Sequence, residues 1–411
     1  MTSHQRLQQK TIKTLSIAQI GTGVGTAGTV AAGSLLVAEI TDSETLAGLA
    51  QTASVLGAAA LALPLARLTS RGGRRVALST GYAAGVIGSL FAIAGGINSN
   101  IYLMLIGSFL VGSASAAAYQ ARFAAIDLVS DEHKAKQLSY VVWGSTVGAV
   151  AGPNLMEPAG KLALRFNLPE LVGPYLISAV TLTFAATLIF LFLKPDPYLT
   201  ALGEGKSKEA SKRNTKEALG HIKKRPIALF AILAISIGHI AMVSVMVMTP
   251  VHMKHVDVSL RIIGLVISVH VIGMYAFSPV VGSISDRIGQ IRTIQVGLLI
   301  LLASAVISGT AAADDVPRLG IGLFLLGLGW SFTLIAGSTL LSSSVDQSLK
   351  TPVQGASDLV MNLAGAFGGA VAGFVISYLN YGWLCAFASI PVILLALWST
   401  TFKALKRPKI K

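Results

Sequence analysis

The sequence predicts an all-α membrane protein in which twelve transmembrane helices form two related six-helix bundles. Three observations lead to this fold class: 53% of the residues are hydrophobic and only 12% are charged, the apolar residues fall into segments long enough to cross a bilayer, and one turn pattern recurs in each half of the chain. Soluble domains carry about 25% charged residues. A chain of 411 residues could form two or three soluble domains, but this composition excludes them.

Twelve apolar segments follow one another along the chain, each about 20 residues long, which is the length that spans a bilayer as a helix. None alternates apolar and polar residues as the strands of an outer-membrane barrel do, so helices are expected. The first six segments cover residues 14–38, 45–66, 76–97, 101–126, 137–156 and 171–193. The second six cover residues 226–250, 259–281, 293–312, 319–344, 355–379 and 383–402.

One long polar segment interrupts this series at Lys194–Arg225, which carries nine basic and four acidic residues. It divides the chain into an N-terminal bundle at 1–193, a basic linker at 194–225, and a C-terminal bundle with a basic tail at 226–411. Residues 206–224 could form a polar helix on the membrane surface. A hinge between two bundles is favoured for this linker over a regulatory or partner-binding site.

The basic residues gather on one side of the predicted membrane. When the loops are assigned to alternate sides, 27 Lys and Arg residues fall on the side of the termini and linker, and five fall on the other. By the positive-inside rule both termini lie in the cytoplasm of a multi-pass protein of the plasma (inner) membrane. The net charge of +14 is therefore explained by topology and contact with lipid head groups, not by nucleic-acid binding.

A similar turn follows the second segment of each half. The first runs Ala66-Arg-Leu-Thr-Ser-Arg-Gly-Gly-Arg-Arg75 and the second Gly282-Ser-Ile-Ser-Asp-Arg-Ile-Gly-Gln-Ile-Arg292. Two related bundles with a site between them suit alternating access. The turns resemble the G-x-x-x-D-R-x-G loop motif of the major facilitator superfamily, and the resemblance covers essentially the whole chain. It implies that the motif's Asp and Arg hold neighbouring cytoplasmic helix ends together in one conformational state.

This resemblance assigns conformational gating to the residues that keep the motif. In the second turn these are Gly282, Asp286, Arg287, Gly289 and Arg292, and in the first they are Arg71, Gly73 and Arg74. The first turn departs from the motif, with Ala66 in place of the Gly and Ser70 in place of the Asp. A weaker latch is therefore expected in the N-terminal half.

Ionisable and polar side chains inside lipid are costly, which makes them candidates for function. Arg122 is interpreted either as a cation that faces substrate or pairs with a carboxylate, or as a side chain that reaches the head groups. Gln19, Tyr119 and Gln120 are candidate cavity residues. Asp358 is expected near the cytoplasmic side, where pairing with the Asp286–Arg287 turn is favoured over substrate contact. Because no carboxylate stands near a segment centre, a proton relay of Asp or Glu residues is not evident.

Methionine and histidine recur at helical spacing in the seventh and eighth segments. Met242 and Met246 are four residues apart, with His239 on the same stripe, and His270 and Met274 repeat the spacing. Thioethers and imidazole are soft, uncharged ligands suited to Cu(I). The pairs resemble those of the copper-importing branch of the superfamily, whose sister group resembles riboflavin carriers. The alternative is that these residues have a structural role only. Met would then fill gaps between apolar helices, and His would form a hydrogen bond with a backbone carbonyl.

A loop between these two segments carries His252, His255 and Asp257 and could capture a cation, although a solvated loop is favoured. The sequence thus predicts a monomeric secondary transporter with no resident cofactor and no enzymatic site. Its partners are the bilayer and a small solute or metal ion. The sharpest version is Cu(I) uptake, with Cu(I) as the transported substrate. One alternative is a carrier of an organic solute, either a riboflavin-like compound or an amphipathic drug, with proton-coupled uptake or efflux. The other is a membrane receptor that does not transport.

Overall fold

The computed structural model describes residues 3–43, 46–203, 220, 222, 225–254 and 259–401. Most of the predicted linker, the loop residues His255 and Asp257, and the basic tail after Thr401 lie outside the described residues. Within them the chain is helical and contains no strand. The all-α membrane fold class is therefore confirmed.

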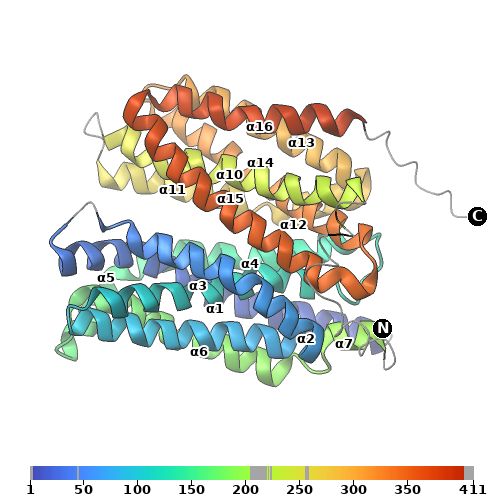
Figure 1. The fold of residues 1–411 in the computed structure, drawn as a ribbon, viewed down its shortest axis with the longest axis horizontal. Coiled ribbons are helices and arrows are strands. Elements are labelled where there is room, and N and C mark those ends of the chain that lie inside the picture. The colour runs from blue at the N-terminus through green and yellow to red at the C-terminus, as the bar shows by residue number, and fades with distance from the viewer. Residues whose placement is uncertain are drawn as a thin grey trace, which may run out of the picture.

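The N-terminal half packs its long helices side by side in the lower part of Figure 1. Its elements are α1 (Ser3–Thr41), α2 (Leu49–Ile97), α3 (Ile101–Ala124), α4 (Lys134–Asn154), α5 (Met156–Arg165) and α6 (Gly173–Phe192), followed by the short α7 (Pro197–Leu202). The C-terminal half forms the upper part of the figure. Its elements are α10 (Pro226–Lys254), α11 (Leu260–Tyr275), α12 (Ser278–Ile288), α13 (Gln290–Gly309), α14 (Val316–Ser344), α15 (Lys350–Tyr378) and α16 (Tyr381–Thr401).

The described parts of all twelve predicted segments lie mainly in helices, but the helix boundaries differ from the prediction at three places. Helix α10 continues to Lys254, so His252, predicted in a loop, lies in a helix. The 49-residue α2 contains both the second and the third segments, because the chain turns inside it at Gly73, whose φ is +85°. The eighth segment is shared by α11 and α12. Ten helical stretches in the described part of the chain are long and apolar enough to cross a membrane. These cover eleven of the segments, and α4 supplies the remaining one.

Small residues let the helices approach one another closely within each half. A Cβ added to Gly148 of α4 would lie 2.5 Å from the Cα of Gly23 on α1. Such small-residue contacts replace the hydrophobic driving force that is missing between helices in lipid. Large apolar side chains are correspondingly exposed on the outer surface, as Leu265, Leu299 and Leu394 are. This arrangement suits a protein that is surrounded by lipid tails.

The two halves meet chiefly through two pairs of helices, α2 with α15 and α4 with α12. In the first pair Gly355 lies against Ala66, and in the second Gly282 lies against Ser139. Both contacts lie toward the end of the molecule at which α7 is found, on the right of Figure 1. We call this the linker end, and the opposite end the far end.

Candidate functional site

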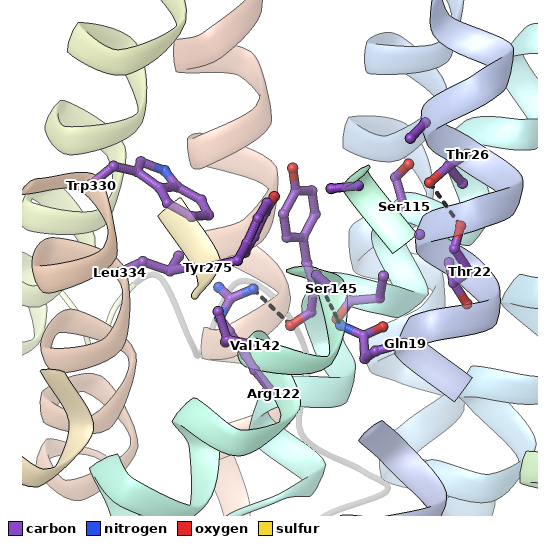
Figure 2. Close-up of a pocket in the computed structure, with 15 residues that line it drawn as sticks. Gln19, Thr22, Thr26, Ser115, Arg122, Val142, Ser145, Tyr275, Trp330 and Leu334 are labelled. Atoms are coloured by element: carbon purple, nitrogen blue, oxygen red, sulfur yellow. Dashed lines mark hydrogen bonds between the residues drawn. The ribbon is translucent and has the colours of Figure 1, made fainter. Parts of the chain in front are cut away.

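A cavity of about 170 Å³ lies between the two halves. Pockets that hold drug-sized ligands usually measure about 300–1,000 Å³, so this conformation is closed tightly around the centre of the protein. Helices α1, α3 and α4 line one side, and α11 and α14 line the other (Figure 2). The polar and aromatic lining residues are Gln19, Thr22, Thr26, Ser115, Tyr119, Arg122, Ser145, Tyr275 and Trp330.

The N-terminal wall of the cavity is polar but uncharged at Gln19. This side chain is buried, and its amide donates to the carbonyl of Ala118 at 3.3 Å. Its Oε1 accepts the hydroxyl of Tyr82 at 3.4 Å. Gln19 therefore holds α1 against α3 and α2 while its edge faces the cavity. It was predicted to be a cavity residue, and it lines the cavity.

The C-terminal wall is aromatic. Tyr275 of α11 and Trp330 of α14 meet edge to face, with ring centroids 5.7 Å apart and an interplanar angle of 84°. The indole Nε1 of Trp330 donates to Nδ1 of His239 on α10 at 3.1 Å. An edge-to-face pair whose indole N–H is satisfied gives this wall of the cavity an ordered aromatic surface. Tyr275, Trp330, Thr22 and Thr26 were not predicted from the sequence, because hydroxyl and aromatic residues are unremarkable inside apolar segments.

Arg122 lies at the base of the cavity and reaches across to the other half. Its guanidinium donates from Nη2 to Oδ1 of Asp358 at 2.6 Å and from Nε to Oγ of Ser338 at 3.0 Å. A third bond runs from Nη1 to the carbonyl of Tyr119 at 2.7 Å. The side chain is only 1% exposed, so it does not extend to the head groups. Of the two interpretations of Arg122, pairing with a carboxylate is the one that the structure displays.

Asp358 differs from its expected place. It was expected to pair with the Asp286–Arg287 turn, but its carboxylate is fully buried against Arg122. At 1.5 Å per residue it stands about 12 Å along α15 from the first residue. Its second oxygen, Oδ2, has no hydrogen-bond partner among the described residues. Asp358 is thus a buried carboxylate near the start of its helix and not at the helix centre, so the expectation that no carboxylate stands near a segment centre is not contradicted.

Gln120, next to Tyr119 in the sequence, is not a cavity residue. Its amide donates to the carbonyl of Ala62 on α2 at 2.8 Å, and its side chain is buried between α2 and α3. Tyr119 itself lines the cavity. One helical step thus separates a lining residue from one that joins helices, and the local sequence carries no signal that distinguishes them.

The methionine and histidine residues lie behind the cavity and not on its surface. Helices α10 and α11 each pack along α14 and have little contact with one another. Met242 and Met274 are both buried in the apolar cluster of the C-terminal half, and Met246 packs against that cluster. None of the five predicted metal ligands is among the residues that line the cavity.

Each of the two histidines has a hydrogen bond to α14. His239 accepts from Trp330, and Nδ1 of His270 lies 2.7 Å from the carbonyl oxygen of Leu323, to which it must donate. His270 is fully buried, and its Nε2 has no partner among the described residues. No group of three His, Cys, Asp or Glu side chains comes together within the described ranges. The Met ligands remain a prediction that this geometry leaves untested.

The first turn meets the C-terminal half through Arg74. The guanidinium is buried, binds Asp127 at 2.7 Å through Nε, and donates to Oε1 of Gln354 on α15 at 2.8 Å through Nη2. Gly73 leaves room for Asp196, whose carboxylate occupies the place that a Cβ would take and accepts the N–H of Arg75 at 2.7 Å. Arg71 is exposed. Ser70 donates only to the nearby carbonyl of Arg67.

The second turn uses different chemistry at the same place in its half. Asp286 accepts the backbone N–H groups of Ala135 and Lys136, each at 3.0 Å, in the first turn of α4. Gly289 has a φ of +92°, where glycine is favoured. Arg287 and Arg292 are exposed. The carboxylate thus satisfies helix N-terminal donors that would otherwise lack partners, as a cap does.

A further contact between the halves lies outside the membrane-spanning helices. Asp131, in the loop before α4, contacts Nζ of Lys134 and accepts the hydroxyl of Ser343 at 3.0 Å. Partial burial favours the protonated carboxyl, but the Lys134 ammonium and the Ser343 hydroxyl outweigh it, so the pKa of Asp131 lies below its usual value. The linker end is thus held shut by several polar contacts.

Two six-helix halves, a central cavity lined by both and polar contacts that close one end define a membrane carrier of small solutes. The family model of the Major Facilitator Superfamily matches residues 15–347 and, in a second match, residues 240–411. The chain therefore belongs to this superfamily. It is a multi-pass membrane protein with many apolar helices, which is consistent with a transporter of the plasma membrane.

Relatives in bacteria support this membership. The chain is 35% identical over 398 residues to the uncharacterized MFS-type transporter YdeG of Bacillus subtilis (strain 168), covering 96% of this chain and 92% of the relative. It is 27% identical over 308 residues to the riboflavin transporter RfnT of Brucella anthropi, covering 74% of each chain.

Solved structures show the same fold. The proton:xylose symporter XylE superposes with a TM-score of 0.75 at 16% identity, covering 97% of this chain and 96% of that one. A bacterial homologue of the iron transporter ferroportin, in an outward-facing state, gives a TM-score of 0.71 at 12% identity, covering 96% and 99%. At these identities the likeness concerns the fold alone.

Proposed function

We propose that this protein is a secondary carrier, acting as a monomer, that moves a small, neutral, planar organic solute by alternating access. The observation that carries this proposal is the central cavity, which combines an aromatic wall at Tyr275 and Trp330 with a polar wall around Gln19. Flat rings stack on aromatic side chains, and amides and hydroxyls supply the few directed hydrogen bonds that fix a ligand.

The charge balance of the cavity favours a neutral solute. Arg122 is the cation among the lining residues, and Asp358 neutralises it at 2.6 Å. Removing one partner of a buried ion pair typically costs about 3–5 kcal/mol, so an anionic solute that drew Arg122 away would have to repay that cost. A neutral ring compound can occupy the space above the pair without breaking it.

The orientation follows from the distribution of basic residues. The linker end carries most of the Lys and Arg residues, so it faces the cytoplasm in this proposal. In this proposal the linker end is the closed cytoplasmic side, and the solute exchanges with the outside at the far end. The direction of net transport is set by gradients.

Riboflavin is the first solute to test, because its ring system suits the aromatic wall and because the relative RfnT is named as a riboflavin transporter. In proteoliposomes we expect riboflavin uptake by the wild-type protein and a three- to tenfold loss for Trp330→Leu, since an aromatic contact contributes about 0.5–1.5 kcal/mol beyond its buried area. Tyr102→Phe, at an exposed position, is the matched control. The proposal fails if no planar solute in a competition panel is transported, or if Trp330→Leu transports as the wild type does.

Cu(I) uptake is the second candidate function, and one observation favours it. Nε2 of His270 is buried and has no hydrogen-bond partner in the described part of the chain, and since Nδ1 carries the proton, Nε2 keeps its lone pair. Met274 lies one helical turn away. Cellular copper in a deletion strain complemented with the wild type or with Met242→Ala/His270→Ala tests it. Equal copper in both strains excludes the metal site.

A further inference from the structure

A second hollow lies on the outer surface of the C-terminal half, between α13 and α16, which pack against one another in the upper part of Figure 1. Its volume is about 420 Å³, which falls in the range of pockets that hold small organic molecules. Ala305 and Gly309 of α13 and Ala386 of α16 line it, and such small side chains leave the space between the two helices open. We call this hollow the lateral groove.

The lateral groove lies at the far end of the protein and faces lipid. Helix α13 starts just after the second turn, at the linker end, so its last residues and the first residues of α16 lie at the far end. Val306 and Trp383 line the groove and are 65% and 53% exposed. Exposed apolar side chains of a membrane protein contact acyl chains, and Trp is enriched where these chains meet the head groups. The groove is therefore open to the surrounding bilayer near its surface.

A guanidinium stands at the polar end of the lateral groove. Thr310 lines the groove, and its Oγ1 accepts from Nη2 of Arg318 at 2.8 Å. Arg318 belongs to the first turn of α14, and its side chain is half-exposed. Its one other side-chain contact within the described ranges is with Asp315, whose Oδ2 lies 3.9 Å from Nε. The guanidinium thus keeps N–H donors for a further acceptor, and such a planar fork suits a phosphate group.

The carboxylates beside Arg318 restrict the kind of head group that fits. Asp314 and Asp315 lie in the turn that leads into α14. Two carboxylates against one guanidinium leave one negative charge in excess, so a purely anionic head group would meet a like charge. A head group that carries an ammonium close to its phosphate meets both signs of charge. A primary ammonium also donates hydrogen bonds to carboxylates, which the quaternary ammonium of choline lacks the N–H to do.

We propose that the lateral groove binds a phospholipid with an ethanolamine head group, whose acyl chain lies between α13 and α16 and whose phosphate is held by Arg318. The ammonium of the same head group faces Asp314 and Asp315. The bound lipid joins α13, α14 and α16 at the far end. The lateral groove shares no lining residue with the central cavity, so this site does not depend on which solute the protein carries.

The test measures quenching of Trp383 fluorescence by lipids with brominated acyl chains. The wild type and Trp383→Phe are reconstituted in phosphatidylcholine vesicles that contain increasing fractions of brominated phosphatidylethanolamine, phosphatidylglycerol or phosphatidylcholine. Quenching that is absent in Trp383→Phe comes from the groove, because the other three tryptophans of the chain are unchanged. We expect half-maximal quenching at a roughly three- to fivefold lower fraction of phosphatidylethanolamine than of the other two lipids, the preference that partly exposed ion pairs provide.

Variants at the polar end separate the contributions of the two charges. Arg318→Ala should remove the preference for phosphatidylethanolamine, and Arg318→Lys, which keeps the charge without the planar fork, should retain part of it. Asp314→Asn should let phosphatidylglycerol bind as well as phosphatidylethanolamine. This change leaves the start of α14 intact, because its N–H acceptor is Asp315. Arg165→Ala, at an exposed arginine of α5, is the matched control and should leave the preference unchanged.

A change of side-chain size tests the acyl-chain part of the lateral groove. Ala386→Leu fills the groove and should weaken quenching by all three brominated lipids. Ala303→Leu, on an exposed face of α13 outside the groove, should not. Circular dichroism and thermal unfolding establish that each variant is folded.

Three results would overturn the proposed lipid site. They are equal quenching by the three lipids, a preference of the wild type for phosphatidylglycerol, and a preference for phosphatidylethanolamine that survives Arg318→Ala. None of these measurements involves transport, so the lipid site and the transport of riboflavin can fail separately.

Discussion

The two related turns close the same end of the protein with opposite chemistry. In the second turn the carboxylate of Asp286 accepts two backbone N–H groups of α4, as a helix cap does. In the first turn Ser70 makes only a local bond, and the buried guanidinium of Arg74 instead reaches Gln354 on α15 while it pairs with Asp127. One turn thus depends on a partly exposed carboxylate and backbone donors, and the other on a buried ion pair.

This difference shows that the turn can keep its place in the fold and its contact with the other half while a different residue makes that contact. The sequence led us to expect a weaker latch where Asp is missing, because the family pattern assigns the latch to that residue. The first turn nevertheless contacts the other half, through an arginine that the motif also contains. Which latch is stronger is a question of energies, and substitutions in the two turns can compare them.

The largest effect is expected from Arg74→Ala. This change leaves Asp127 as an unpaired buried charge and Gln354 without the donor to its Oε1. It also removes the guanidinium whose Cζ lies 5.7 Å from the centre of the Tyr198 ring. Breaking a buried pair costs about 3–5 kcal/mol, which thermal unfolding in detergent would register as a large fall in midpoint. Arg71→Ala, at an exposed position in the same turn, should change stability by less than about 0.5 kcal/mol. Equal effects of the two changes would contradict the role of Arg74.

The glycines of the two turns should respond unequally. Gly73 and Gly289 have φ values of +85° and +92°, so alanine is strained at both by about 1–3 kcal/mol. At Gly289 an added Cβ meets nothing within 4 Å, whereas at Gly73 it would displace the carboxylate of Asp196. We expect Gly73→Ala to destabilise the protein by about 1–2 kcal/mol more than Gly289→Ala, from overpacking. Chemical unfolding monitored by helicity measures this difference, and a difference near zero would show that Asp196 moves freely.

Asp286→Ala should open the linker end without unfolding the protein. Loss of the carboxylate that accepts two backbone N–H groups at the start of α4 costs about 1–2 kcal/mol. Ser139 is buried beside Gly282 at this contact, so Ser139→Cys labelled with a membrane-impermeant maleimide reports opening. We expect roughly five- to thirtyfold faster labelling at that cost in free energy. The natural Cys385 is buried and serves as the background, and Asp286→Asn should give an intermediate rate. Unchanged labelling would mean that the second turn does not hold the end shut.

The sequence was sufficient for the helices because a bilayer demands about 20 apolar residues for each crossing, and this constraint is readable locally. It was insufficient for the partners of the charged residues. Arg122 and Asp358 were each singled out, but they lie 236 positions apart in different halves, so only the packing of α3 against α15 reveals the pair. Likewise, the four-residue spacing of Met242 with Met246 and of His270 with Met274 predicts shared helix faces, but it does not predict that α10 and α11 both pack along α14 with little contact between them.

The cavity itself had the weakest signal. Its aromatic wall is built from Tyr275 and Trp330, and such residues are common in apolar segments for packing alone. His239 was suggested as a metal ligand by its place on the same helix stripe as Met242 and Met246, whereas the structure gives it a hydrogen-bond donor, Trp330, that lies 91 positions away. Charge and unusual spacing can be recognised in a sequence, but a neutral binding surface emerges only when the helices are placed.

The smallest effect, and the most informative about the two turns, is expected from Ser70→Asp. Asp286 follows Gly282 by four residues and reaches the first turn of α4, and Ser70 follows Ala66 by four residues, where Ala66 lies against Gly355. A carboxylate at position 70 should by the same geometry reach the first turn of α15, which begins at Lys350. Favourable helix-end charges contribute about 0.3–1 kcal/mol.

We therefore expect Ser70→Asp to slow maleimide labelling of Ser139→Cys by about two- to fivefold, the rate change that a helix-end charge of this strength gives. Ser70→Asn, which has the same shape without the charge, should give little change. Slower labelling would mean that the two turns are still equivalent positions and that the first has only lost its carboxylate. Faster labelling would mean that the first turn no longer places position 70 near the N–H groups of α15. An Asp there would then be buried without hydrogen-bond donors, and this cost would favour the open linker end.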